Sequence, residues 1–367
     1  MPTNTNVSRL PWLDGWRGLA IAMVLLSHFA FRGNSWTGGF GVLLFFVLSG
    51  SLMSELLFIK QVRFGDFFFR RMTRIIPTFW LYVLALAAVN NYVFSLPNKV
   101  AAGELMATLA FLRTYLPPDD NIWLAHWPIG HLWSLNIEEH SYIFLAAGAY
   151  ACRKSVKKWV APAFLIASAA AAFAIGLYYS MHPPAGASPW YLRSECASFG
   201  LIIAAALRLI RHHYPVWTVA PILPLMAFAL GTIAFVISPA YILNGGVAPL
   251  CLAFSLVYLD RLPTPLRNLL SAKWLGYFGI SSFSLYIWQQ PFFALMGKYQ
   301  LHPAVAFAGA ITTAALSFFC YENRIRIKLN RTWENRKNRV GERVEANYSV
   351  LLPTQSQSPA PHENMLD

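Results

Sequence analysis

The sequence predicts an all-α integral membrane protein with about ten transmembrane helices and both termini in the cytoplasm. Of its 367 residues, 56% are hydrophobic and only 12% are charged, whereas soluble proteins carry about 25% charged residues. The apolar residues gather in repeated runs of roughly 17 to 22 residues, the length that crosses a bilayer as a helix. The basic residues gather between alternate runs, as the positive-inside rule requires.

The apolar runs place the expected helices in order along the chain. The predicted spans cover residues 12–31, 40–58, 77–94, 131–150, 159–179, 192–210, 216–237, 241–259, 274–297 and 301–320. Residues 101–113 are amphipathic and too short to cross a membrane, so we expect an interfacial or re-entrant helix there.

The distribution of charge sets the expected orientation. If the N-terminus is cytoplasmic, 24 of the 29 Lys and Arg residues fall in cytoplasmic segments. Adding or removing one span in the middle of the chain would destroy this bias. The net charge of +13 then reflects loops that face anionic lipid, and no nucleic-acid partner is expected.

The chain divides into a transmembrane domain, residues 1–330, and a cytoplasmic basic and disordered tail, residues 331–367. From about residue 340 the tail is rich in Ser, Gln, Pro and Asn, a composition typical of disorder. The four cysteines are scattered without the paired spacing of a metal site, so no metal is expected. The first apolar run is too long for a signal-peptide core, and no cleavable signal is expected.

The first span carries two side chains that are costly in a bilayer, Arg17 and His28. An ionisable residue inside a span is a functional candidate by default. On a continuous helix, eleven steps of about 100° bring the two residues to one face, about 16 Å apart. The spacing therefore predicts a fixed cation and a proton-transferring base on one wall of a cavity.

The second span and the segment after it each allow two interpretations. Ser49 and Gly50 either form a small-residue patch for close helix packing or belong to a polar site. Arg71 and Arg74, three residues apart, share one helical face. They either anchor the chain at the cytoplasmic interface or clamp phosphate groups, such as the diphosphate of a coenzyme A donor.

The fourth span opens with Ser134, Glu138 and Glu139, and adjacent carboxylates in a span are hard to explain by packing. Neighbouring helical positions diverge by about 100°, so only one of the two glutamates can face a cavity fully. Ser134 lies one turn before Glu138, on the same face. The alternatives are a structural ion pair with Arg17 or Arg193, and a carboxylate that orients an imidazole.

Polar residues of the later spans also have two interpretations. Arg193 and Glu195 open the sixth span, and Tyr286 and Gln289 lie near the end of the ninth. They either belong to an interfacial belt or line a polar route through the protein. The outer loops carry aromatic residues, for which a membrane belt is slightly favoured over stacking on sugar rings. These residues are Trp36, Trp123, Trp127, Trp190 and Tyr191.

Taken together, these segments resemble the membrane acyltransferase 3 family, the integral-membrane O-acyltransferases of surface polysaccharides, antibiotics and related glycans. Five motifs follow in the family's order and cover the ten-span region. They are Arg-x10-His (Arg17, His28), Phe-Phe-x-x-Ser-Gly (residues 45–50), Arg-Arg-x-x-Arg-x-x-Pro (70–77), Trp-Ser-Leu-x-x-Glu-Glu-x-x-Tyr (133–142) and Ser-Leu-Tyr-x-Trp (284–288). Each motif is weak alone, and their order makes the resemblance specific.

Three departures from the family pattern bear on function. After Ser-Leu-Tyr-x-Trp the family usually has a histidine where this chain has Gln289. The site therefore lacks a second imidazole, and proton transfer is expected to depend on His28. The sixth-span motif usually pairs Arg with Asp, and here the acid is Glu195. The esterase-like domain fused to many members does not follow the tenth span. Transfer is therefore expected to finish within the membrane domain or with a separate extracytoplasmic partner.

The resemblance implies an O-acyltransferase, by default an O-acetyltransferase, in the inner (plasma) membrane of a bacterial cell. It would move an acyl group from cytoplasmic acyl-CoA to a hydroxyl of a carbohydrate or glycolipid acceptor such as a surface polysaccharide. Acetyl-CoA is the default donor. No bound cofactor is expected, because acyl-CoA is a substrate.

The resemblance also suggests roles for individual side chains. His28 would be the general base for the acceptor hydroxyl. Arg17 would act on the donor or on developing charge, and Glu138 would orient His28 or another donor group. The expected acyl-CoA-binding residues are Arg71, Arg74 and Ser49, and the further polar candidates are Glu139, Arg193, Tyr286 and Gln289.

The competing class is a proton-coupled transporter or flippase, because intramembrane Arg, His and Glu residues suit a carrier too. Against it, the sequence has no internal repeat, and its Gly/Pro-interrupted segments do not recur in matching halves. Dependence on acyl-CoA separates the two classes, since a carrier needs none. Direct transfer is favoured over an acylated serine or cysteine, which lack an activating motif here, while transient acylation of His28 stays open.

Overall fold

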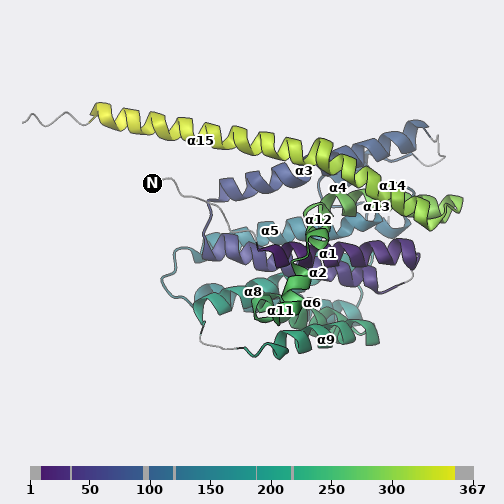
Figure 1. The fold of residues 1–367 in the computed structure, drawn as a ribbon, viewed down its shortest axis with the longest axis horizontal. Coiled ribbons are helices and arrows are strands. Elements are labelled where there is room, and N and C mark those ends of the chain that lie inside the picture. The colour runs from purple at the N-terminus through teal and green to yellow at the C-terminus, as the bar shows by residue number, and fades with distance from the viewer. Residues whose placement is uncertain are drawn as a thin grey trace, which may run out of the picture.

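The computed structural model describes residues 10–33, 35–93, 99–118, 121–186, 188–215 and 219–351. Every regular element formed by these residues is a helix (Figure 1), which confirms the all-α fold class. Four helices of the described chain are long and apolar enough to cross a membrane: Thr37–Ile59, Phe64–Tyr92, Val160–Met181 and Pro303–Arg339. The helices Ile222–Ile237 and Ile242–Val257 are apolar but shorter. The total of ten spans and the cytoplasmic position of both termini stay predictions.

The elements of the N-terminal half correspond closely to the predicted spans. They are α1 (Pro11–Leu25) with the π-helical turn η1 (Leu26–Ala30), α2 (Thr37–Ser54) with η2 (Glu55–Ile59), α3 (Phe64–Ala88) with η3 (Val89–Val93), α4 (Ala102–Leu109), η4 (Ile122–Leu124), η5 (Gly130–Leu132) and α5 (Trp133–Cys152).

The C-terminal half alternates longer helices with short turns. Its elements are α6 (Val160–Met181), η6 (Trp190–Leu192), α7 (Ser194–Ala197), α8 (Phe199–His213), α9 (Ile222–Ile237), η7 (Ile242–Val247), α10 (Ala248–Val257), η8 (Leu259–Arg261), α11 (Thr264–Leu270), α12 (Lys273–Ile280), α13 (Ser282–Tyr299), α14 (Pro303–Leu316), η9 (Ser317–Glu322) and α15 (Asn323–Leu351).

Two predicted spans have different boundaries in the structure. The span predicted from residue 77 is part of α3, which begins at Phe64 and contains Pro77 in its interior. Proline is tolerated there because neighbouring groups in a membrane helix can satisfy the carbonyl that it leaves free. The span predicted over 274–297 is two helices, α12 and α13, which meet at Ser281.

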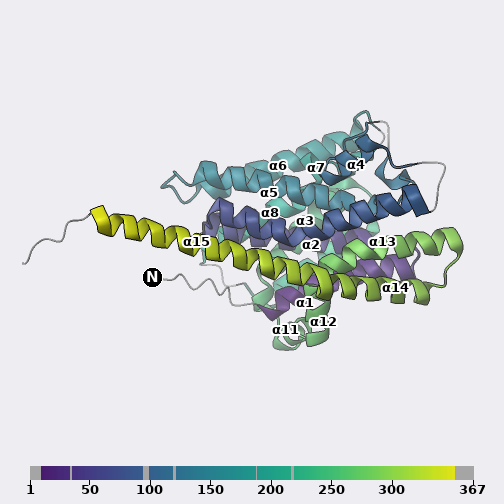
Figure 2. The same ribbon diagram turned by 90° about the horizontal axis from the view of Figure 1, so that it is seen from above.

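The predicted tail of residues 331–367 is helical in its first part, because α15 continues to Leu351. In Figure 1 and Figure 2 this helix projects beyond the bundle, at the end where α3 begins. We call this end of the molecule the α15 end. Disorder was expected from about residue 340, yet helix continues to Leu351, and residues 352–367 lie outside the described part of the chain. The Arg-, Lys- and Glu-rich sequence favours helix, and Trp333 packs its ring on Phe69 of α3.

The bundle is held together by close helix pairs. α1 packs against α2 and α12, α2 packs against α8, and α8 packs against α6 and α10. At the contact between α2 and α8, a Cβ atom on Gly50 would lie 1.9 Å from the carbonyl oxygen of Leu201. Only glycine allows this approach, so the packing interpretation of Gly50 is confirmed.

Residues 101–113 form a short helix and a loop that pack on one side against the bundle, and the expected interfacial or re-entrant position stays a prediction. α4 packs against α3, and the following loop buries Arg113 completely. The guanidinium of Arg113 lies 3.1 Å from the carboxylate of Glu104, which also accepts a 2.6 Å hydrogen bond from the indole N–H of Trp127. Because buried charges need such partners, this pair fixes the segment against the rest of the bundle.

Candidate functional site

The described residues enclose two large cavities of different chemistry. The first, of about 1010 Å³, is lined by arginines of α1 and α3 and reaches the α15 end; we call it the arginine cavity. The second, of about 810 Å³, is lined by His28, His126 and His131; we call it the histidine cavity. Val42, Phe46 and Tyr286 line both cavities, so these three side chains form a common wall.

The arginine cavity has an excess of positive charge. Seven basic and four acidic residues line it. The basic residues are Arg17, Lys60, Arg63, Arg70, Arg71, Arg74 and Lys337, and the acidic residues are Glu55, Asp66, Glu138 and Glu334. Guanidinium groups at this density favour a phosphate-bearing ligand, because each can donate two parallel hydrogen bonds.

Arg71 is held by three groups of α5. Its guanidinium lies 3.6 Å from the carboxylate of Glu138 and 3.4 Å from that of Glu139, and it stacks 3.2 Å above the ring of Tyr142. Glu138 also accepts a 3.1 Å hydrogen bond from the hydroxyl of Ser49. The ion pair expected for the glutamates therefore exists, but with Arg71 rather than with Arg17 or Arg193.

Arg17 and Arg74 extend the positive surface beside Arg71. Arg17 pairs with Asp14 at 2.8 Å, and Arg74 interacts electrostatically with Arg17, Arg71 and Glu322. All three arginines line the cavity, as do Ser49, Ser134 and Glu138. The predicted common face of Ser134 and Glu138 is thus observed, with both side chains facing the same space.

His28 lies in the other cavity and makes one short hydrogen bond. Its Nδ1 lies 2.5 Å from Oε1 of Gln289, and its ring stacks on Phe293 with a centroid separation of 4.4 Å. Because an amide oxygen can only accept, Nδ1 carries the proton and Nε2 is left with a free lone pair. Gln289 is fully buried, and its own amide N–H groups donate to the backbone carbonyl of Tyr286 at 3.4 Å and to the side-chain amide oxygen of Gln290 at 3.3 Å.

Two expectations about His28 are wrong. Arg17 and His28 do not share one wall, because Arg17 lines the arginine cavity and His28 the histidine cavity. The physical reason is η1, since a π-helical turn changes the angular step per residue just before position 28. Glu138 does not orient His28 either, because its partners are Ser49 and Arg71, and the orienting group is Gln289.

Arg193 lies apart from both cavities. It faces Glu195 at 3.8 Å and stacks 5.6 Å from the ring of Tyr115. The hydroxyl of Tyr115 donates a 2.5 Å hydrogen bond to the same carboxylate. Burial, reinforced by this hydrogen bond, raises the pKa of Tyr115 to about 12, so the phenol stays protonated. The contacts among Arg193, Glu195 and Tyr115 hold the start of α7 in place. Arg193 itself lines neither of the two cavities.

His131 opens the fourth predicted span, where the sequence assigned it no role, and it lines the histidine cavity. Its side chain is almost fully buried, yet neither ring nitrogen makes a well-oriented hydrogen bond to any described residue. Its carbonyl accepts a 2.7 Å hydrogen bond from the hydroxyl of Tyr286, which also contacts Ser134 at 2.6 Å. The available signal was the position of His131 two residues before the Trp-Ser-Leu motif.

Aromatic side chains complete the histidine cavity. Of the five outer-loop residues with two interpretations, Trp123, Trp127 and Tyr191 line this cavity. An aromatic lining beside an imidazole offers flat apolar surfaces to a ring-shaped acceptor.

Comparison with known proteins identifies the family of the chain. Residues 10–322 match the acyltransferase 3 family model, described as an acyltransferase domain. The chain is 27% identical over 329 residues to the peptidoglycan O-acetyltransferase OatA of Listeria monocytogenes, which covers 80% of this chain and 51% of OatA. It is also 27% identical over 323 residues to Bacillus subtilis YrhL, provisionally named a peptidoglycan O-acetyltransferase, with 78% and 49% covered. The chain spans about half the length of these relatives, and no solved structure matches it.

The family match covers every helix that lines the two cavities except α15. It therefore contains His28, Gln289 and the three arginines, together with the wall between the cavities. On this evidence, the chain belongs to the acyltransferase 3 family.

Proposed function

We propose that the protein is an O-acetyltransferase that takes acetyl from acetyl-CoA in the arginine cavity and transfers it to a glycan hydroxyl in the histidine cavity. The observation that carries this proposal is the common wall of Val42, Phe46 and Tyr286 between two chemically different cavities. A single pocket would suit a binding protein. Two pockets that meet at one wall suit the passage of a small group from one ligand to another.

The positive charge and the length of the arginine cavity suit acetyl-CoA, the proposed donor. Along α2 its lining extends from Val42 to Lys60, which at 1.5 Å per residue is about 27 Å. A donor with its acyl end at the wall would place its phosphates among Arg71, Arg74 and the basic residues beyond them. This arrangement requires the α15 end to be cytoplasmic, as the positive-inside distribution predicts.

The histidine cavity supplies the groups that an acceptor requires. His28 is the base, and the exposed rings of Trp123 and Tyr191 offer aromatic surfaces to a sugar ring. The matched relatives are named for peptidoglycan. Peptidoglycan or a related surface glycan is therefore the first acceptor to test.

The proposed reaction transfers the acetyl group directly from the thioester to the acceptor hydroxyl, and the hydroxyl proton ends on the thiolate that leaves. Nε2 of His28 removes the proton from the acceptor hydroxyl while the hydroxyl oxygen attacks the thioester carbonyl carbon. The new C–O bond forms, the C–S bond breaks, and the proton held on Nε2 passes to the departing thiolate. Gln289 keeps Nδ1 protonated throughout, so that Nε2 is always the nitrogen that exchanges the proton. We assign the stabilisation of the transient oxyanion to His131, because it lines the same cavity and its ring nitrogens make no well-oriented hydrogen bond to a described residue.

Labelled acetyl-CoA and purified protein in lipid vesicles test the proposal. We expect label in a glycan fraction with the wild type and with His182→Ala, an exposed histidine at the end of α6, but not with His28→Ala. Transfer by His28→Ala at the wild-type rate would remove His28 from the mechanism. A wild type that neither binds acetyl-CoA nor transfers label would overturn the acetyltransferase proposal and favour a carrier.

A further inference from the structure

The mouth of the arginine cavity is partly formed by α15. Glu334 and Lys337 of this helix line the cavity together with Arg63, Asp66 and Arg70 of the start of α3. The family match ends at residue 322, so Glu334 and Lys337 belong to a segment beyond the matched region. We call these five residues the mouth cluster.

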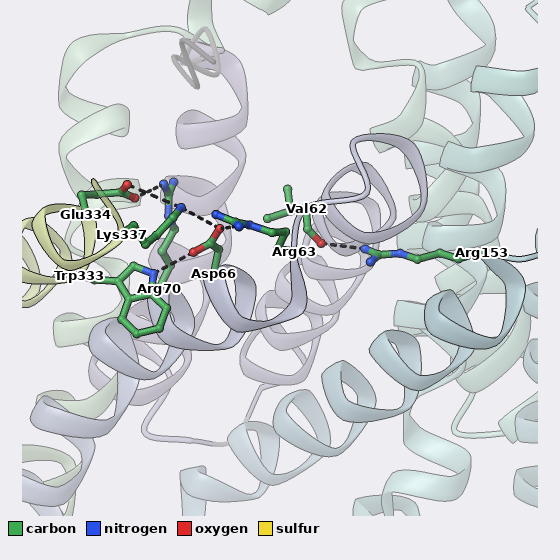
Figure 3. A network of polar contacts seen from close by, with 8 residues as sticks. All are labelled: Val62, Arg63, Asp66, Arg70, Arg153, Trp333, Glu334 and Lys337. Atoms are coloured by element: carbon green, nitrogen blue, oxygen red, sulfur yellow. Dashed lines mark hydrogen bonds and ion pairs between the residues drawn. The ribbon is translucent and has the colours of Figure 1, made fainter. Parts of the chain in front are cut away.

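Asp66 is the centre of the mouth cluster, as Figure 3 shows. One carboxylate oxygen accepts a 2.8 Å hydrogen bond from the indole N–H of Trp333. The other lies 2.9 Å from the ammonium of Lys337 and 3.3 Å from Nε of Arg63. The ring of Trp333 stacks on Phe69 at 4.2 Å. These contacts hold α15 against α3 and fix the position of Lys337 at the cavity.

The ion pairs of the two arginines of the mouth cluster are exposed to water, so these arginines are held only weakly. The side chains of Arg63, Arg70 and Glu334 are 76%, 49% and 42% exposed. Arg70 pairs with Glu334 at 2.8 Å, but exposed ion pairs contribute little net free energy because water competes for both charges. A phosphate with two negative charges would accept stronger hydrogen bonds from the same donors.

The distance from the mouth cluster to the common wall suits the length of a coenzyme A donor whose acyl group lies at the wall. It neighbours Lys60, at the far end of the stretch of about 27 Å that begins at the common wall. Arg71 and Arg74 lie between the mouth cluster and the wall. In coenzyme A the diphosphate lies between the pantetheine arm and the adenosine, whose ribose carries a further phosphate at its 3′ position. The order of cationic groups along the cavity matches the order of phosphates along this molecule.

We propose that Arg63, Arg70 and Lys337 bind the 3′-phosphate of the coenzyme A donor, and that α15 is therefore part of the donor site. This inference rests on the proposed function, in which acyl-CoA occupies the arginine cavity. Asp66 is a positioning residue here, because it holds Lys337 without contacting the ligand.

The experiment compares acetyl-CoA with 3′-dephospho-acetyl-CoA as donors. For the wild type we expect the KM of the dephosphorylated donor to be about tenfold higher, as for the loss of charge-assisted hydrogen bonds at a partly exposed site. Lys337→Ala should raise the KM for acetyl-CoA by several-fold and leave that for the dephosphorylated donor unchanged. Lys337→Arg should restore most of the preference. Arg336→Ala removes an exposed charge of the same helix and is the matched control.

The possible outcomes separate this inference from the proposed function. Equal KM values for the two donors with the wild type would overturn the 3′-phosphate site while leaving the acetyltransferase intact. A KM increase of the same size with both donors in Lys337→Ala would show a structural effect and also overturn it. If neither donor binds or supports transfer, the proposed function itself fails. The wild-type comparison needs no variant and decides the question even if a substitution prevents folding.

Discussion

Replacing Gln289 with leucine tests whether its amide sets the protonation of His28, the proposed catalytic base. Leucine keeps a similar volume but removes the oxygen that lies 2.5 Å from Nδ1 of His28. Gln289 is 0% exposed, so water cannot easily supply a new acceptor. The N–H group of His28 would lose its partner, and the ring could rotate or adopt the tautomer that protonates Nε2.

The size of the effect follows from the free energy of an unpaired buried donor. Leaving such a group without a partner costs about 1 to 3 kcal/mol. A factor of ten in rate corresponds to about 1.36 kcal/mol, so kcat should fall by about 5- to 160-fold. The KM for acetyl-CoA should not change, because the proposed donor site is the arginine cavity, which His28 does not line.

The assay is the initial rate of labelled acetyl transfer by purified protein in lipid, measured at several acetyl-CoA concentrations. Gln289→Glu keeps an acceptor at the same position and should retain more activity than the leucine variant. Lys298→Leu, at the exposed end of α13, controls for substitution on the same helix. A leucine variant with an unchanged Tm and a kcat within twofold of the wild type would refute the assigned role of Gln289.

Three further predictions address other parts of the molecule. His131→Phe removes the proposed oxyanion donor, so kcat should fall by about 100-fold with little change in the acetyl-CoA KM; an unchanged kcat would exclude this role. Gly50→Ala inserts a methyl group 1.9 Å from the carbonyl of Leu201 and should cost about 1 to 3 kcal/mol, seen as a lower Tm in detergent, whereas an equal Tm would contradict the close contact. Burial raises the pKa of Asp260, but hydrogen bonds of 2.7 and 2.8 Å from Arg211 outweigh it and hold the pKa below its usual value. Its stabilising effect is present above the unfolded-state pKa and is lost as pH falls through the folded-state pKa, so Asp260→Asn should lower the Tm at neutral pH but not in acid.

The sequence predicted the site best where a regular helix relates neighbouring positions. Ser134 and Glu138 line one cavity, as expected for residues one turn apart. Ser49 and Gly50 were interpreted either as a small-residue patch for helix packing or as part of a polar site, and each residue fits one of these interpretations. Ser49 faces the arginine cavity and Gly50 packs against α8, because adjacent helical positions diverge by about 100°.

The sequence could not predict the parts of the site that depend on irregular backbone or on contacts between residues far apart in the chain. The π-helical turn before His28 has no signature in the local residues, so the common wall predicted for Arg17 and His28 was wrong. The partner of His28 is 261 positions away at Gln289. Asp66 and Trp333, which hold α15 in place, are 267 positions apart. Pairings of this kind depend on the tertiary fold and cannot be derived from spacing.

The common wall of Val42, Phe46 and Tyr286 has an electrical consequence. Because both cavities approach it and water fills such spaces, most of the membrane voltage would drop across this single layer of side chains. In the proposed reaction the acetyl group crosses that layer without charge, whereas the proton that passes from His28 to the thiolate crosses it in the opposite direction and carries a charge. Moving one elementary charge through 100 mV is equivalent to about 2.3 kcal/mol. The rate of turnover in energised cells would then depend on the voltage as well as on the supply of donor.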